Sequence, residues 1–315
     1  MAKPVFNVEM LPAKHGDALF VQYGKEGNLR RVLIDGGPLP AYPQLEKRLK
    51  KLPQGDQGVE LLVITHVDTD HIEGIIRLLA PPKADWPIEV GEIWFNGWRH
   101  IEEANTLGGR EGEMMSALIH ARADDKWNTT FNREAVCCGK PGADDVKLAD
   151  GMKLTLLSPD AEALAKLLED WKAKLSGPGW TFEPGDLEEA WKRLVEAKKF
   201  HPGSELTLGP GDLTPKLLKL LKGIDSSTAN GSSIAFIAQF EGKSCLFLGD
   251  AHMDVVCRSL ERLGYTKDKP LKADAVKVSH HGSRNNVTQA FLELVDARHW
   301  LFSSNGDKHK HPNKA

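Results

Sequence analysis

Cysteine is scarce in this chain, which has only four cysteines among its 315 residues. Cys137 and Cys138 are adjacent, and Cys245 and Cys257 lie far from them in the sequence. This spacing matches neither a zinc ribbon nor a Cys-x-x-Cys redox motif, and adjacent cysteines are poor disulfide partners. We therefore expect buried free thiols and a reducing, cytoplasmic compartment.

Long apolar runs and blocks of like charge are also lacking. No stretch approaches the roughly 20 apolar residues needed to cross a bilayer, and residues 1–8 lack the apolar core of a signal peptide. Lysine and arginine number 41 against 44 acidic residues, so the net charge is only −3. The sequence predicts a soluble protein with no membrane partner, and its overall charge argues neither for nor against nucleic acid.

Strand-like patterns cluster toward both ends of the chain, and helical patterns lie between them. Strands are predicted at 5–10, 19–23, 31–34, 61–63, 92–95, 152–157, 232–240, 244–248, 275–278 and 300–303. Helices are predicted at 45–52, 108–123 and 253–263, and another starts at residue 75. We interpret the chain as one α/β domain over residues 1–315, with two sheets packed face to face and helices outside.

A helical insertion is predicted at about 160–230 within this domain. Two apolar stripes at helical spacing support it, and a third short helix is predicted at 213–221. The stripes consist of Leu164, Leu167, Leu168, Trp171 and Leu175, and of Leu187, Trp191, Leu194 and Val195. The insertion is either a helical subdomain packed on the core or a surface for a lid or a protein partner.

The densest group of side chains able to bind a metal lies on the loop between a buried strand and a helix. His66, Asp68, Asp70 and His71 fall within six residues. In an extended segment His66 and Asp68 point to one side, whereas the adjacent Asp70 and His71 must splay apart. A solvated turn is the alternative, but carboxylates packed this closely repel each other unless a cation lies between them. Two pairs aimed differently fit two metal ions better than one.

Other ligand-type residues follow other predicted strands. Asp35 precedes two glycines and either orients the metal loop or belongs to an ordinary turn. Asp250 either bridges the metals or caps the helix that follows it. His280 and His281 form a pair after a strand, with a pair of turn histidines as the alternative. His311, taken alone, would be a solvated residue of the tail.

Taken in order, these motifs resemble those of the metallo-β-lactamase-fold hydrolases. The matching stretches are His15–Gly16–Asp17–Ala18, Leu33–Ile34–Asp35–Gly36–Gly37, Thr65–His66–Val67–Asp68–Thr69–Asp70–His71, Asn230–Gly231–Ser232–Ser233, Leu248–Gly249–Asp250, His280–His281–Gly282–Ser283 and His311–Pro312. The chain looks closest to the branch typified by the hydrolase domain of the ComEC-type DNA-uptake channel. That branch also has an aspartate in place of the second histidine of the His-x-His-x-Asp-His motif. The resemblance covers the chain except about 97–150 and 160–228, and it implies a metallo-β-lactamase αββα sandwich with a helical insertion.

The resemblance also implies a ligand set. His66 and Asp68 would bind the first metal, Asp70 and His71 would bind the second, and Asp250 would bridge both. Asp70 would thereby also take part in catalysis.

Further roles are implied for residues around these ligands. One of His280 and His281 would be a metal ligand or would lie on the scissile group; we take His280 as the ligand and His281 as catalytic. His311 would complete the second site or donate a proton. Asp17 and Asp35 would stand behind the ligands and orient them.

The implied cofactors are two divalent metal ions. Zn²⁺ and Mn²⁺ are the candidates, and Mg²⁺ is also compatible, because Asp68 offers a hard oxygen where an imidazole is usual. The histidine that usually completes the first site would fall near Ser158, where the sequence has none. We therefore expect the first site to be weaker or more open than the second. Relatives usually carry another helix after the His-Pro motif, so the sequence is expected to continue past Ala315.

The implied function is metal-dependent hydrolysis, most favourably by a phosphodiesterase that cleaves nucleic acid with metal-activated water. A local basic groove would suffice to bind the nucleic acid. Its candidates are Lys140, Lys147, Lys272, Lys277, Arg284, Lys308 and Lys310. The alternatives are a small-molecule hydrolase acting on a phosphoester or lactone, and an effector subunit that depends on a protein partner docked on the helical insertion.

Overall fold

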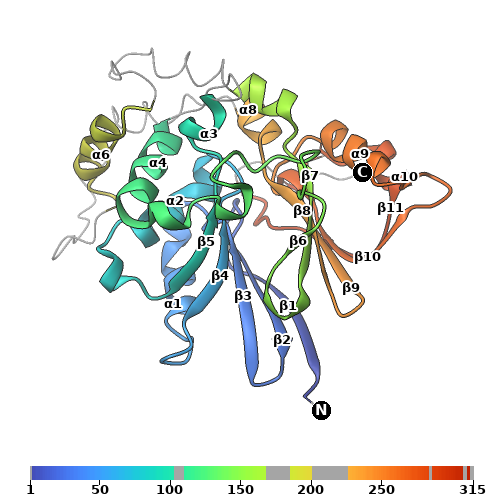
Figure 1. Ribbon diagram of the computed structural model, residues 1–315, viewed down its shortest axis with the longest axis horizontal. Helices are drawn as coiled ribbons and strands as arrows, with labels where there is room; N and C mark the ends of the chain where they lie inside the picture. The colour runs from blue at the N-terminus through green and yellow to red at the C-terminus, as the bar shows by residue number, and fades with distance from the viewer. Residues whose placement is uncertain are drawn as a thin grey trace.

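The computed structural model describes residues 2–102, 110–167, 185–200, 226–283, 286–307 and 311–312. The described strands form two mixed sheets, one of five strands and one of six (Figure 1). Side chains from both sheets meet in one buried cluster, so the sheets pack face to face. Helices cover the outer face of each sheet, which gives four layers in the order helices, sheet, sheet, helices.

The first sheet comes from the N-terminal third of the chain. Its strands in spatial order are β1 (Pro4–Met10), β2 (Leu19–Lys25), β3 (Asn28–Ile34), β4 (Gly58–Val63) and β5 (Glu89–Trp94). Strands β1 to β3 are antiparallel, and β3, β4 and β5 are parallel. Ile34 pairs with Val63, so β3 and β4 end side by side. The turns that follow these two strands therefore leave the sheet together.

The second sheet is built from the remaining strands. These are β6 (Val146–Lys147), β7 (Lys153–Ser158), β8 (Ala235–Phe240), β9 (Lys243–Phe247), β10 (Leu271–Lys277) and β11 (Val295–Leu301). Strands β9, β10 and β11 are parallel, and β6 to β9 are antiparallel. Lys277 pairs with Phe247, so β9 and β10 also end side by side.

Alternation along the strands divides the core into layers. Val63 and Trp94 face Leu156 and Phe247 between the sheets. The opposite faces of the sheets pack on helices. Those described are α1 (Tyr42–Leu49), α2 (Thr69–Leu79), α3 (Trp98–Glu102), α4 (Arg110–Ala123), α6 (Leu187–Glu196), α8 (Ser226–Gly231), α9 (Met253–Arg262) and α10 (Gln289–Leu294). Short 3-10 turns occur at Leu39–Ala41, Lys83–Asp85, Asp124–Lys126, Thr129–Phe131, Ala149–Gly151 and Ser279–Gly282.

The strand predictions are confirmed in position, and several boundaries are corrected. Strand β11 begins at Val295 rather than residue 300, because its first half is the polar, exposed part of an edge strand. Helix α2 begins at Thr69, so Asp70 and His71 lie in its first turn and not on an extended loop. Acidic residues favour a helix N-terminus, which accounts for the earlier start. β6, α3 and α10 are too short to leave a periodic signal.

The insertion is described only in part. Helix α6 is confirmed, with Ala190 and Leu194 buried against the helices of the first layer, whereas Val195 is half-exposed. In the first stripe, Leu164 and Leu167 are helical and buried. The other residues of that stripe, Leu168, Trp171 and Leu175, and the helix predicted at 213–221 lie outside the described residues. The four cysteines are buried free thiols, as expected. Among the described helices, none combines the length and the apolar composition that a membrane crossing requires.

Two glycines let α2 approach the turn that follows β3. A Cβ on Gly74 would lie 2.0 Å from the Gly36 carbonyl oxygen, and a Cβ on Gly36 would lie 2.6 Å from the Ile75 backbone nitrogen. The Gly74 N–H donates to the Gly37 carbonyl (2.9 Å), and the Gly36 N–H donates to the His71 carbonyl (2.8 Å). This contact holds the first turns of α2 against the end of β3.

We expect Gly74→Ala to lower the free energy of unfolding by about 3 kcal/mol, because the new methyl group meets backbone atoms that cannot rotate away. Gly58→Ala is the matched control, since nothing lies within 4 Å of its added Cβ. Urea denaturation measures both variants. Equal losses in the two would contradict the close approach.

Candidate metal centre

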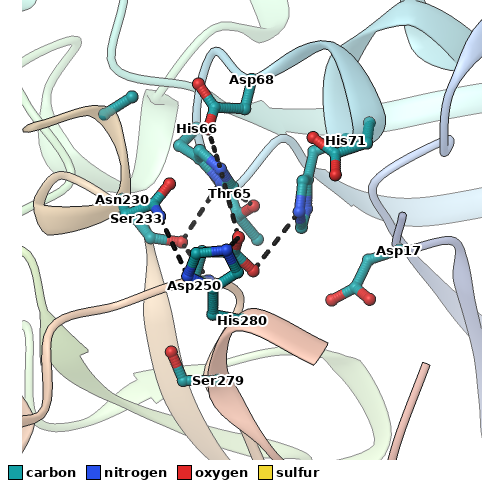
Figure 2. Close-up of polar contacts among 12 residues, drawn as sticks. Asp17, Thr65, His66, Asp68, His71, Asn230, Ser233, Asp250, Ser279 and His280 are labelled. Atoms are coloured by element: carbon teal, nitrogen blue, oxygen red, sulfur yellow. Dashed lines mark hydrogen bonds and ion pairs between the residues drawn. The ribbon is translucent and has the colours of Figure 1, made fainter. Parts of the chain in front are cut away.

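Side chains from several segments converge where the strands of both sheets end. Figure 2 shows those of Asp17, His66, Asp68, His71, Asp250 and His280. His66 to His71 follow β4, Asp35 follows β3, and Asp250 follows β9. His280 and His281 follow β10, and Asp17 comes from the loop between β1 and β2. Neighbouring strand ends explain the convergence, because β3 pairs with β4 and β9 pairs with β10.

Asp250 lies at the middle of this group and is 2% exposed. Its Oδ1 is 3.3 Å from His71 Nε2, and its Oδ2 is 3.8 Å from His281 Nε2. His66 Nε2 and His280 Nε2 each lie 4.0 Å from Oδ2. The alternative that Asp250 caps a helix is wrong, because α9 begins at Met253 with His252 in the capping position.

The other two aspartates of the motif extend the group in different directions. Asp68 Oδ2 lies 3.6 Å from His66 Nε2, and Asp70 Oδ2 lies 3.7 Å from His281 Nε2. Asp68 occupies the N-cap position of α2 without capping it through its side chain. Asp250 therefore stands between one group formed by His66 and Asp68 and another that includes Asp70 and His281.

The donor set fits divalent cations. His66 Nε2, His71 Nε2, His281 Nε2 and Asp250 Oδ1 are buried and make no hydrogen bond to any described residue. The three Nε2 atoms lie 3.3–4.0 Å from the carboxylate oxygens of Asp250 without forming hydrogen bonds to them. These separations match a coordination shell, because ligand atoms about 2.1 Å from a tetrahedral metal lie about 3.4 Å from one another. Burying four polar atoms without hydrogen bonds at one point costs free energy, and a bound cation would remove that cost.

Asp35 holds His71 from behind. It is fully buried, and its Oδ2 lies 2.7 Å from His71 Nδ1. The same carboxylate accepts hydrogen bonds from the backbone N–H (2.8 Å) and the hydroxyl (2.7 Å) of Thr65. A carboxylate bonded to one ring nitrogen fixes the ring so that the other nitrogen faces the metal position.

The Nδ1 atoms of the other two rings are held in the same way. His281 Nδ1 lies 3.2 Å from Asp17 Oδ1 and 3.1 Å from Ser303 Oγ. His66 Nδ1 lies 2.9 Å from Thr65 Oγ1 and 3.4 Å from Ser233 Oγ. Each Nε2 is thereby directed into the centre.

The charges of this buried group shift its pKa values. Burial lowers the pKa of His71, but the carboxylates of Asp250 and Asp35 outweigh burial and raise it well above its usual value. Burial also lowers the pKa of His281, but the carboxylates of Asp250 and Asp17 outweigh burial and raise it to about 9. Burial would raise the pKa of Asp250, but His71 and His281 hold it well below its usual value. Protons thus occupy the positions that a cation would take, so metal binding releases protons and weakens on acidification.

Asp17 is further stabilised by a buried lysine. Burial would raise the pKa of Asp17, but the Lys277 ammonium, 2.6 Å from its Oδ2, and the His281 ring lower it. Lys277 is fully buried, so it is not part of a surface groove and that prediction is wrong. Lys277 is the last residue of β10, and its side chain can be buried because Asp17 supplies the compensating charge.

The remaining members of the predicted groove are dispersed. Lys140, Lys147 and Lys272 are exposed and pair with Glu134, Asp145 and Asp296. Arg284, Lys308 and Lys310 lie outside the described residues.

The geometry favours roles for the paired histidines opposite to those expected. His281 is 2% exposed, and its ligand atom lies within 4.8 Å of those of Asp17, His71 and Asp250. The His280 side chain is 27% exposed, and its Nδ1 lies 3.3 Å from Asn230 Nδ2. Of the two, His281 is the one whose ring lies among the buried atoms that could hold a metal, and His280 is the one accessible to solvent. The half-buried His311 makes an edge-to-face contact with His280, with ring centres 5.6 Å apart.

Backbone strain accompanies these positions. Asp35, His280 and His281 have φ values of 57°, 48° and 54°, in the left-handed region that side chains other than glycine rarely adopt. Such strain costs of order 1 kcal/mol or more per residue and persists where surrounding contacts hold it. Here it sends the two adjacent histidines in different directions.

Three hydroxyl residues contact the buried histidines of the centre, and none of them was assigned a role from the sequence. They are Ser303, Ser233 and Thr65. Thr65 and Ser233 belong to the motif stretches, whereas the only sequence sign of Ser303 is a polar residue near a strand end. Ser158 lies near the position where the resemblance would place a further histidine. It is buried, and its hydroxyl makes no hydrogen bond to a described residue.

A scan against protein-family models and a search of curated proteins found no match to this chain. The fold and the site by themselves define a mixed α/β protein with a buried histidine–aspartate cluster whose donor atoms can hold a metal.

Proposed function

We propose that the protein is a metal-dependent hydrolase of the metallo-β-lactamase fold that cleaves phosphodiester bonds in nucleic acid. The observation that carries the proposal is the buried Asp250 carboxylate facing the Nε2 atoms of His66, His71 and His281, which make no hydrogen bond to a described residue. The arrangement of helices, sheet, sheet and helices supports the fold assignment, as does the site at the strand ends.

Residues are available for two metal positions that share Asp250. His66 and Asp68 would hold the first metal together with Asp250. Asp70, His71 and His281 would hold the second, again with Asp250, and Asp17 stands within reach of it. When bound, the metals would lower the pKa of water toward neutrality and offset negative charge on the phosphate oxygens.

The other residues orient, exclude water and move protons. Asp35 and Asp17 fix the rings of His71 and His281, and their burial keeps competing water away from the ligand atoms. His280 is the exposed histidine of the centre, with one nitrogen near Asn230 and the other 4.0 Å from Asp250. We assign His280 the role of the general acid, which donates a proton to the leaving oxygen. His311, beside His280, is placed to assist that transfer.

The protein stripped with EDTA is expected to cleave single- or double-stranded DNA or RNA only after Mn²⁺ or Zn²⁺ is restored. His71→Ala, purified in the same way, is the control for contaminating nucleases and is expected to be inactive. The substrate panel should include a phenyl phosphodiester and an aliphatic lactone.

Three results would overturn the proposal. Cleavage of nucleic acid that survives in His71→Ala assigns the activity to another protein. Hydrolysis of the lactone without cleavage of nucleic acid replaces the nuclease by a small-molecule hydrolase. Absence of any transition metal from the purified and metal-incubated protein, measured by elemental analysis, removes the basis of the mechanism.

A further inference from the structure

A cleft of about 470 Å³ lies beside the metal centre. It opens between the loop after β1, the start of α1 and the segment after β11. Its walls are mainly apolar and include Leu11, Pro12, Ala13, Pro40 and Phe302. Volume and lining are typical of a site for a small organic group.

The cleft and the metal centre share a wall. Ser303 lines the cleft, and its hydroxyl lies 3.1 Å from His281 Nδ1 and donates to Asp17. Gly16 also lines the cleft and directly precedes Asp17, whose backbone N–H donates to the Asp70 carbonyl (3.2 Å). A group held in the cleft would therefore lie close to the metal centre.

Phe302 gives the cleft an aromatic surface. The residue is 43% exposed, which is unusual among the large hydrophobic residues that the structure describes. A Cβ on Gly282 would lie only 2.6 Å from Phe302 Cδ1, so the ring packs on the backbone immediately after His281. A half-exposed ring held against rigid backbone is the kind of surface on which a planar base stacks.

Lys14 supplies a positive charge at the same cleft. It lines the cleft, is exposed, and makes no ion pair with any described residue. Its carbonyl accepts a hydrogen bond from the Asn305 N–H (2.9 Å), which ties its loop to the segment that carries Phe302. An aromatic surface and an unpaired cation side by side match a base and its phosphate.

We propose that this cleft is a nucleobase subsite, in which the base next to the scissile phosphodiester stacks on Phe302 while Lys14 contacts a neighbouring phosphate. The inference rests on the proposed function and deepens it, because it makes an aromatic base a required part of the substrate. An aliphatic acyl chain of a lactone would contact the apolar walls, Phe302 included, but it would gain neither base stacking nor a phosphate contact with Lys14.

Calorimetric titration with adenosine 5′-monophosphate and with ribose 5-phosphate tests the subsite without any turnover. The nucleotide is expected to bind at least about tenfold more tightly than the sugar phosphate. Phe302→Leu, which keeps an apolar side chain, should remove that difference, and Phe302→Trp should retain it. Lys14→Met should weaken both ligands by a similar factor and flatten the salt dependence of binding. Leu292→Ala, an exposed hydrophobic residue on α10, is the control and should bind like the wild type.

Equal binding of the two ligands, or nucleotide binding unchanged by Phe302→Leu, would overturn the subsite. So would binding of an aliphatic lactone that Phe302→Leu leaves intact in a protein that does not bind the nucleotide. The proposed function fails separately. If the nucleotide binds through Phe302 but no nucleic acid is cleaved, the subsite proposal holds and the nuclease proposal is wrong. If the rate of nucleic acid cleavage changes neither in Phe302→Leu nor on a substrate with abasic positions, the nuclease proposal holds and the subsite proposal is wrong.

Discussion

Asp250→Asn is expected to lower metal-dependent hydrolysis by about 1000-fold or more and to reduce the bound metal by about half or more. Asparagine keeps the size of the side chain, and the Asp250 N–H can still donate to Ser233 Oγ (3.0 Å). The amide NH₂ cannot act as a ligand, and it would face the Nε2 atoms that now face a carboxylate. The loss is therefore electronic rather than steric.

The same change has a second readout in the metal-free protein. Asp250 is a main reason that the pKa of His281 is raised to about 9 and that the pKa of His71 is raised, while burial acts in the opposite direction. Without the negative charge, burial prevails, so both pKa values should fall. NMR titration of the histidine ring signals measures this shift directly.

Asp254→Asn is the matched control for this prediction. It makes the same chemical change on α9, where the side chain is 68% exposed and pairs with Arg258. We expect activity within about twofold of the wild type, since exposed ion pairs contribute little. A folded Asp250→Asn protein that retained its full metal content and activity within tenfold would contradict the central place given to Asp250.

The sequence was sufficient for the parts of the centre that depend on local pattern. Short, mainly apolar segments locate β4, β9 and β10, and the ligand-type residues follow them closely. Parallel pairing then brings those ends together, as in β3 with β4 and β9 with β10. For this reason His66, Asp250 and the histidine pair could be named from the sequence alone.

Roles that depend on backbone handedness could not be predicted in this way. His280 and His281 are adjacent and chemically identical, so no periodicity indicates which ring turns inward. Their left-handed φ values, with the His280 N–H donating to the Gly249 carbonyl (3.1 Å), decide that His281 is buried. The sequence pattern therefore placed both residues at the centre but could not divide their roles.

Contacts between the two ends of the chain were equally hidden. Lys277 lies in a strand where a lysine is normally exposed, and Asp17, far away in the sequence, supplies the negative charge that makes its burial tolerable. Ser303 reaches the same Asp17 from beyond β11. These pairs follow from the packing of one sheet on the other, which a single sequence does not encode in any local pattern.

Asp35→Asn is expected to weaken metal affinity by about 10- to 100-fold and to lower the free energy of unfolding by about 3 kcal/mol. Asparagine tolerates the left-handed backbone (φ 57°) as well as aspartate does, so the substitution tests the carboxylate and not the turn. Exposed Asp268→Asn should change neither quantity. Chelator competition measures the affinity, and urea denaturation of the metal-free protein measures the stability.

The reason lies in the number of donors that meet at this one carboxylate. Asp35 accepts hydrogen bonds from the N–H and hydroxyl of Thr65, and its Oδ2 also lies 2.7 Å from His71 Nδ1. An amide that accepts from the Thr65 N–H turns its NH₂ toward His71 Nδ1, which must then lose its proton to Nε2, the atom meant for the metal. Nitrogen NMR of His71 would detect this exchange of tautomer. A variant with the wild-type tautomer and unchanged affinity would mean that Asp35 contributes to folding alone, and that His71 is positioned by the packing of α2 on Gly36.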